Sequence, residues 1–138
     1  MSQKNLMQIP RGLRNNNPLN IRKGSVWVGM KHEQKDDSFV QFASMEYGIR
    51  AAFVLLRTYI VNRKLNTIRL VISRWAPASE NDTEAYIANV VKWSGIPENY
   101  ILSIYDREIM INLFQAMCRM ENGRFLDRSI VIKGYSLI

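Results

Sequence analysis

The chain has 138 residues, of which 47% are hydrophobic and 22% charged, with a formal net charge of +7. This length and balance predict one globular domain with its own hydrophobic core and exclude a disordered chain. The positive charge predicts attraction to polyanions as a class, namely nucleic acid, anionic lipid or an anionic cell-wall polymer.

Cysteine and histidine usage narrows the chemistry further. The single cysteine, Cys118, excludes an intrachain disulfide and a cysteine-based zinc cluster. It lies in an apolar segment, where a small buried thiol is expected and a nucleophile is not. Because the one histidine, His32, has no second histidine or cysteine to join it, we expect no metal site and no cofactor.

The N-terminal third is expected to be irregular. Residues 1–10 read as a flexible lead-in without the apolar stretch of a signal peptide, and no stretch is long enough for a membrane span. "RGLRNNNPLNIRKG" follows, and its asparagine run with a proline favours turns. "SVWVGMKHEQKDDSFVQF" then places short β-prone pieces on either side of a polar tip, which predicts a small β-hairpin.

From Ser44 onward the apolar residues recur with helical spacing. Asn66 is a plausible N-cap for the second helix, Asn81 with Glu84 resembles a capping box for the third, and Gly95 suits its C-terminus. The last long helix is predicted to run from Asp106 to Gly123, and the tail is expected to form one more short turn or helix. The predicted helices cover 44–63, 66–76, 81–95 and 106–123. The expected fold is mainly α, one domain over 11–138 with a small β element near its start.

Glu121 is the acidic residue with the most suggestive position. It extends an apolar stripe along the last long helix, made by Met110, Leu113, Phe114 and Met117. Desolvation by this stripe and the negative end of the helix dipole would both favour the protonated carboxyl. A protonated carboxyl is what a glycosidase needs to protonate a leaving-group oxygen. The alternative is a helix-end carboxylate that points into water.

Three motifs in order resemble the C-terminal half of a lytic transglycosylase of the lysozyme-like superfamily. "GIRAA" (48–52) stands where that family has "IRAG", "RWAPA" (74–78) where it has "NAGP", and "ENDTEAYIANV" (80–90) where it has "ETRxYV". The resemblance implies an α+β lysozyme-like fold and a cleft that Tyr86 lines.

The acid-bearing helix of that family precedes these motifs, whereas here the matching stretch, "FQAMCRMENG" (114–123), comes last. The resemblance therefore implies a circular permutation with Glu121 as the catalytic glutamate, which the closeness of chain ends in compact domains tolerates. "NPLNIRKGSVWVGM" is similar to the stretch that follows the catalytic glutamate in flagellar-type glucosaminidases. The hairpin would then be the β-lobe.

From Arg11 onward the chain also resembles a group of small bacteriophage proteins, some known only as virion structural proteins. They share "RGxRNNNPxNI", "RWAPxxENDTxxYI" and "ENG". This likeness implies a phage or prophage source and an enzyme that cleaves the β-1,4 bond between N-acetylmuramic acid and N-acetylglucosamine. The alternative is a noncatalytic virion protein that retains the fold. We expect a chain made in the host cytoplasm that acts on the cell wall, in the periplasm, or is carried in the virion.

The reaction type depends on a second carboxylate. A lytic transglycosylase needs only Glu121, whereas a muramidase would use a second acid, for which the candidates are Glu33, Asp37 and Glu80, with Asp36 beside them. A carboxylate in such a polar segment is more often a solvated charge than a catalytic group, which slightly favours the transglycosylase.

Further candidates follow from the same resemblance. The expected substrate-binding residues are Asn15, Asn16, Asn17, Trp27 and Tyr86, against the alternatives of turn or core positions. The predicted partners are peptidoglycan glycan strands and other virion proteins, for a monomer. Specific nucleic-acid binding is disfavoured because the basic residues are scattered around the helices.

Overall fold

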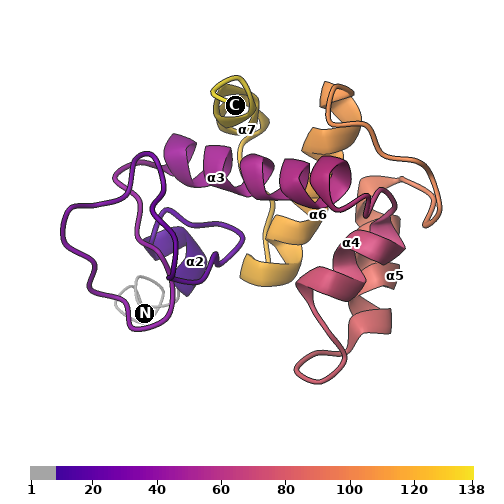
Figure 1. Ribbon diagram of the computed structural model, residues 1–138, viewed down its shortest axis with the longest axis horizontal. Helices are drawn as coiled ribbons and strands as arrows, with labels where there is room; N and C mark the ends of the chain where they lie inside the picture. Colours follow the sequence, from indigo (N-terminus) through magenta and orange to yellow (C-terminus); the bar gives the residue numbers. More distant parts are fainter. Residues whose placement is uncertain (1–8) are drawn as a thin grey trace, which may run out of the picture.

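Helices carry most of the regular backbone in the computed structural model, which describes residues 9–138 (Figure 1). The predicted lead-in therefore lies mostly outside the described residues. In chain order the helices are α2 (Arg11–Arg14), α3 (Met45–Arg57), the π-helical turn η1 (Thr58–Asn62), α4 (Ile68–Trp75), α5 (Thr83–Ser94), α6 (Arg107–Asn122) and α7 (Arg128–Tyr135). The prediction of a mainly helical single domain is confirmed.

Local capping chemistry sets the helix ends. Ser44 and Asp106 cap α3 and α6, and Gly95 and Gly123 end α5 and α6 in the left-handed conformation, as predicted. Two predicted N-caps were wrong by one residue. Thr67, not Asn66, accepts from Leu70 N at the start of α4, and Asp82, not Asn81, accepts from Ala85 N at the start of α5.

The predicted capping box fails for a physical reason. The carboxylate of Glu84 does not turn back to its own helix, because it accepts two hydrogen bonds from Arg69 of α4, at 2.8 and 2.9 Å. Arg69 also pairs with Glu98, which follows α5. These ion pairs join α4 to the segments at both ends of α5.

The first long helix does not keep one geometry to its end. The prediction of a single helix over 44–63 misses the change at Thr58, where α3 passes into η1. The Thr58 hydroxyl donates to Val54 O at 3.1 Å, and wider helical turns of this kind are often found near functional sites. This change of geometry matters because η1 carries Tyr59, and Tyr59 lines a cavity beside the end of α6.

The predicted β-hairpin is not confirmed. Residues 24–43 form an irregular loop in which the described backbone makes two isolated antiparallel bridges, Arg22 with Phe39 and Met30 with Phe42. Side chains replace the missing ladder, since the Gln34 amide donates to Gln41 O at 2.7 Å and accepts from Gln41 N at 2.8 Å. Amide side chains satisfy the backbone here without extended pairing.

The core is centred on α6, and α3 crosses it in front with α7 packed alongside (Figure 1). Phe53 of α3 stacks on Phe114 of α6 with ring centroids 5.2 Å apart, and Tyr135 of α7 meets Phe53 edge-on at 5.1 Å. A smaller cluster of Ile21, Val40, Phe42 and Ala51 lies between the N-terminal loop and the other side of α3. Within residues 9–138, no helix combines the length and apolar character that a membrane crossing requires.

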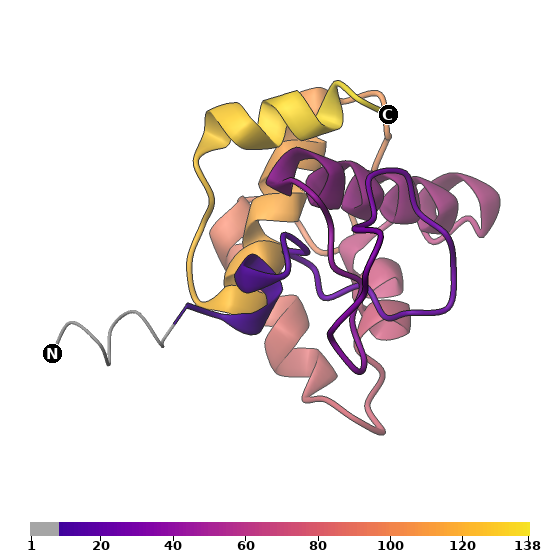
Figure 2. The ribbon, with the colours of Figure 1, turned by 90° about the vertical axis from the view of Figure 1, so that its left-hand side faces the viewer.

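The start of the described chain lies beside the end of α6. Figure 2 shows α2 next to the last turns of α6, and the Asn122 amide donates to Pro18 O at 2.7 Å. Gly12 makes this approach possible, because a Cβ there would lie 2.6 Å from Asn122 Oδ1 and 2.9 Å from Asn17 O. Segments more than a hundred residues apart in sequence therefore meet at Glu121.

Candidate functional site

An open cavity of about 520 Å³ lies at the junction of the N-terminal loop, η1, α4 and the end of α6. Its size lies within the range of ordinary ligand sites. The residues that line it are Leu19, Asn20, Ile21, Arg22, Ser25, Trp27, Phe39, Leu55, Tyr59, Trp75, Ala76, Pro77, Glu80, Asn81 and Glu121.

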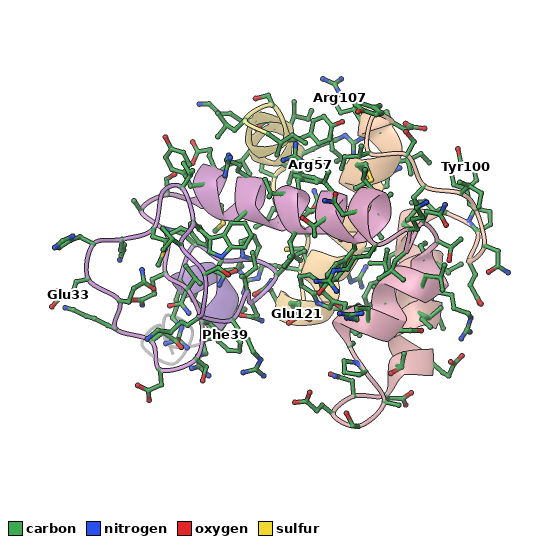
Figure 3. All side chains as sticks on the ribbon, in the orientation of Figure 1. Glu33, Phe39, Arg57, Tyr100, Arg107 and Glu121 are labelled. Atoms are coloured by element: carbon green, nitrogen blue, oxygen red, sulfur yellow. The ribbon has the colours of Figure 1, made fainter. Side chains whose placement is uncertain are left out.

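Glu121 lies in the last turn of α6 and is half-buried in the wall of this cavity (Figure 3). Asn20 Nδ2 donates to its Oε1 at 2.8 Å, and the Tyr86 hydroxyl donates to its Oε2 at 3.0 Å. A helix-end carboxylate free in water would not have both oxygens held in this way. Glu121 is an oriented group facing a cavity.

The apolar stripe below Glu121 explains this position. Met110, Leu113, Phe114 and Met117 are all fully buried and fix the rotation of α6, so that the next residue along the stripe reaches the cavity. Gly123 then ends the helix with a φ of 76°, which keeps the last turn helical up to Asn122. The packing of the stripe and the end of the helix at Gly123 together direct the Glu121 carboxyl toward the cavity.

Two neutral groups adjoin the carboxyl. Burial, and the charge and hydrogen bond of Glu121, raise the pKa of Tyr86 well above 10, so its hydroxyl keeps its proton and donates. Burial raises the pKa of Cys118 to about 11, which keeps the thiol protonated. The sequence-based interpretation of Cys118 as a buried, unreactive thiol agrees with this environment.

The asparagine run has a structural role in the described chain. Asn17 is fully buried, donates to Ile21 O and Val40 O, and accepts from Ile21 N. Asn15 is bonded to Asp36 and Gln41, and Asn16 donates to Phe42 O at 3.1 Å. These amides are directed at the protein's own loop and not at the cavity, which Asn20 lines instead.

The candidate second carboxylates are spread apart. Glu33 lies at the outer edge of the loop, far from Glu121 in Figure 3, with Lys35 3.7 Å away. Asp37 is exposed and does not line the cavity, whereas the exposed Glu80 does. Asp36 has a structural role, because its hydrogen bonds with Arg11 hold the pKa of its carboxyl well below its usual range.

Aromatic side chains form much of the cavity wall. Trp27 lines it, as predicted for a sugar platform, and its indole Nε1 is buried without a hydrogen-bond partner among the described residues. The sequence reasoning missed Phe39, Tyr59 and Trp75, the last two packed edge to face with centroids 6.0 Å apart. Trp75 continues the apolar spacing of its helix, and periodicity carries no signal that distinguishes the wall of a cavity from the core.

The donor set does not suggest a metal centre. Over residues 9–138 no three histidine, cysteine or acidic side chains come together in a group that could hold an ion. The chemistry of the cavity therefore has to be argued from Glu121, its two donors, Glu80, Arg22 and the aromatic wall.

Comparison with known proteins gives one informative relative. No family model matches the chain. It is 45% identical over 120 residues to Protein P5 of Pseudoalteromonas phage PM2, an alignment that spans 84% of this chain and 73% of the relative. The matched part is long enough to include most of the described domain.

Proposed function

The chain belongs to the family of Protein P5 of Pseudoalteromonas phage PM2, and from the geometry of its cavity we propose that it is a phage-borne peptidoglycan glycosidase. Its substrate is the β-1,4 bond between N-acetylmuramic acid and N-acetylglucosamine, and it acts on the wall from the periplasm or as part of the virion. The observation that carries the proposal is Glu121, a carboxyl held by Asn20 and Tyr86 in the wall of a cavity lined by aromatic side chains.

The proposed mechanism uses Glu121 first as an acid. It protonates the bridging oxygen as the bond to the muramyl carbon breaks through an oxocarbenium-like transition state. The resulting carboxylate then takes the proton of the muramyl 6-hydroxyl, which closes an anhydro ring and completes a lytic transglycosylase reaction. Glu80 is the one sequence-predicted second acid that lines the cavity, and it would serve a hydrolase instead.

The cavity wall supports a sugar substrate. Trp27, Phe39, Tyr59 and Trp75 offer apolar faces on which the C–H faces of a sugar ring can pack, while Asn81 and Ser25 offer polar groups for hydroxyl and N-acetyl groups. The net charge of +7 favours approach to an anionic wall, more so at low salt.

A lysozyme-like domain with its acid-bearing helix placed last is part of this proposal. It is supported by the position of the segment 11–21, which lies beside the end of α6 as the segment after a catalytic glutamate would. The loop over residues 24–43 would take the place of the β-lobe.

The second candidate is a noncatalytic phage component that keeps the same domain. Family membership supports this second candidate more directly than it supports the enzyme, because membership indicates a phage protein and is no evidence of an activity. A carboxylate with both oxygens hydrogen-bonded also suits a structural role that joins α5, α6 and the N-terminal turn.

Digestion of purified peptidoglycan separates these candidates. The protein is incubated with cell-wall sacculi, and the released fragments are identified by mass spectrometry. Anhydromuramyl ends are the expected product, and reducing ends would instead assign a hydrolase. Sacculi that stay intact, with folding of the protein verified by circular dichroism, would contradict the enzyme and favour the structural component.

A further inference from the structure

Asn20 forms a hydrogen bond with Glu121 that the sequence pattern does not predict. It lies in the turn after Pro18, lines the cavity, and donates from Nδ2 to Glu121 Oε1 at 2.8 Å. This bond joins positions 20 and 121, and so ties the N-terminal turn to the last turn of α6. In this bond the amide N–H donates and Oε1 of Glu121 accepts.

Two features define the position of Asn20. Its φ is 53°, in the left-handed region that asparagine and glycine adopt more often than other residues. Its Oδ1 is buried and has no hydrogen-bond partner within the described chain. That oxygen and Asn122 Oδ1, which is also without a partner among the described residues, lie 2.9 and 2.6 Å from the point where Gly12 would carry a Cβ. A buried polar atom without a partner is rare and calls for a functional explanation.

We propose that Asn20 is a positioning residue that points the Glu121 carboxyl into the cavity and keeps Oε1 an acceptor, which leaves Oε2 to carry the transferable proton. This inference rests on the proposed glycosidase function. The proton moves from Oε2 to the bridging oxygen as the bond from that oxygen to the sugar carbon breaks, and the carboxylate is left behind. A protonated Oε2 still has a lone pair with which it accepts from the Tyr86 hydroxyl, so its own proton is available to the bridging oxygen.

The ionisable groups around Glu121 allow its titration to be compared between variants. Tyr86 of α5 and Cys118 of α6 keep their protons near neutral pH, because burial raises the pKa of both. Arg22 from the N-terminal segment and Glu80 from the turn before α5 are the charged side chains that share the cavity. Neither is changed in the variants below, so a difference between variants reports on the Asn20 amide.

The test compares Asn20→Gly and Asn20→Asp with the wild type. Glycine and aspartate both tolerate a positive φ, so the backbone is kept while the donor is removed in one and replaced by a like charge in the other. Asn16→Gly is the matched control, since Asn16 has the same φ of 53° but donates to Phe42 O. The rate of peptidoglycan cleavage is measured as a function of pH, with unfolding curves for every variant.

We expect both Asn20 variants to cleave about tenfold more slowly at the wild-type optimum because the acid is no longer aligned. The alkaline limb of the profile should move to higher pH in Asn20→Gly and further in Asn20→Asp, because a carboxylate loses a donor and then gains a like-charged neighbour. Asn16→Gly should keep the wild-type profile per folded molecule. Variants with reduced rates and an unmoved alkaline limb would overturn the proposal.

A second readout does not depend on activity. The ¹³C signal of the Glu121 carboxyl, assigned by its loss in Glu121→Gln, is titrated by NMR in the wild type and the Asn20 variants. If sacculi stay intact but the titration midpoint rises in the order wild type, glycine, aspartate, Asn20 holds the carboxyl and the proposed enzyme function fails. If sacculi are cleaved and the midpoints coincide, the function stands and the role of Asn20 fails.

Discussion

At the scale of single residues, the site depends on which polar groups are directed at the cavity and which at the protein itself. Glu121, Asn20 and Tyr86 form one hydrogen-bonded set, whereas Asn15, Asn16 and Asn17 hold the N-terminal loop. Helical spacing placed Glu121 on an apolar stripe and the resemblance singled out Tyr86, whereas the prediction for the asparagine turn named Asn15, Asn16 and Asn17 and missed Asn20, which lines the cavity. The direction of a side chain in an irregular turn depends on φ and on tertiary partners, which local sequence does not encode.

Tyr86→Phe tests the second donor of Glu121. The ring stays buried, but Oε2 loses its hydrogen bond, and bonds to charged groups contribute about 1.5–3 kcal/mol. We expect peptidoglycan cleavage to slow by roughly 10-fold to 100-fold if that contribution is realised in the transition state. Tyr135→Phe is the control, since it removes a hydroxyl bonded to Ile104 O and should lower stability with no change in rate per folded molecule. Equal effects of the two substitutions would argue against a role for Tyr86 at the site.

At the scale of elements, the site is assembled where α3 and the end of α6 meet the N-terminal turn. Gly48 of α3 allows the first of these contacts, because a Cβ at this position would lie 1.7 Å from Asn16 O. The C-terminal ends of α5 and α6 were predictable from Gly95 and Gly123, whereas η1 and the loop over 24–43 were not predictable. Their geometry depends on Thr58 and on the Gln34–Gln41 amide pairing, for which periodicity carries no signal.

Gly48→Ala should destabilise the domain by about 3 kcal/mol or more, since the clash is with backbone and one of the two segments has to move. Gly123→Ala is the comparison, because its Cβ would meet no atom of the described chain within 4 Å and the cost is that of a φ of 76°, about 1 kcal/mol. Urea unfolding measures both. A smaller loss for Gly48→Ala than for Gly123→Ala would contradict the close approach of α3 to the asparagine turn.

The contact between Asp36 and Arg11 predicts a pH dependence of stability. Because the hydrogen bond with Arg11 lowers the pKa of Asp36 in the folded state, its contribution is present above the unfolded value of about 3.9 and is lost as the pH falls below it. Asp36→Asn should therefore be less stable than the wild type at neutral pH, with a difference that narrows as the pH is lowered from about 4.

Urea unfolding midpoints between pH 2 and pH 7 measure this difference. The neighbouring Asp37→Asn is the control, because that carboxylate is exposed and the difference in stability between this variant and the wild type should be small at every pH. A stability difference for Asp36→Asn that stays constant across the pH range would mean that the contact does not contribute through the carboxylate charge.

At the scale of the whole molecule, a domain of a phage protein family presents one oriented carboxyl in an aromatic-lined cavity. Composition and periodicity predicted the helical class and the position of Glu121 at the end of α6. They could not predict the cavity, because its walls come from four segments, and Tyr59, Trp75 and Phe39 follow the same apolar pattern as core residues. Which apolar side chains remain at a surface is decided when the elements are assembled.

The most direct test of the central claim is the rate of glycan cleavage by Glu121→Gln relative to the wild type on purified sacculi. The substitution keeps the shape of the side chain and removes the transferable proton, and general acid catalysis contributes about 10²-fold to 10⁴-fold. Glu80→Gln, a second carboxyl lining the same cavity, is the matched control. The account predicts a loss of at least about 10²-fold per folded molecule for Glu121→Gln, with the folded fraction taken from its unfolding curve. Wild-type cleavage rates in the folded glutamine variant would contradict it.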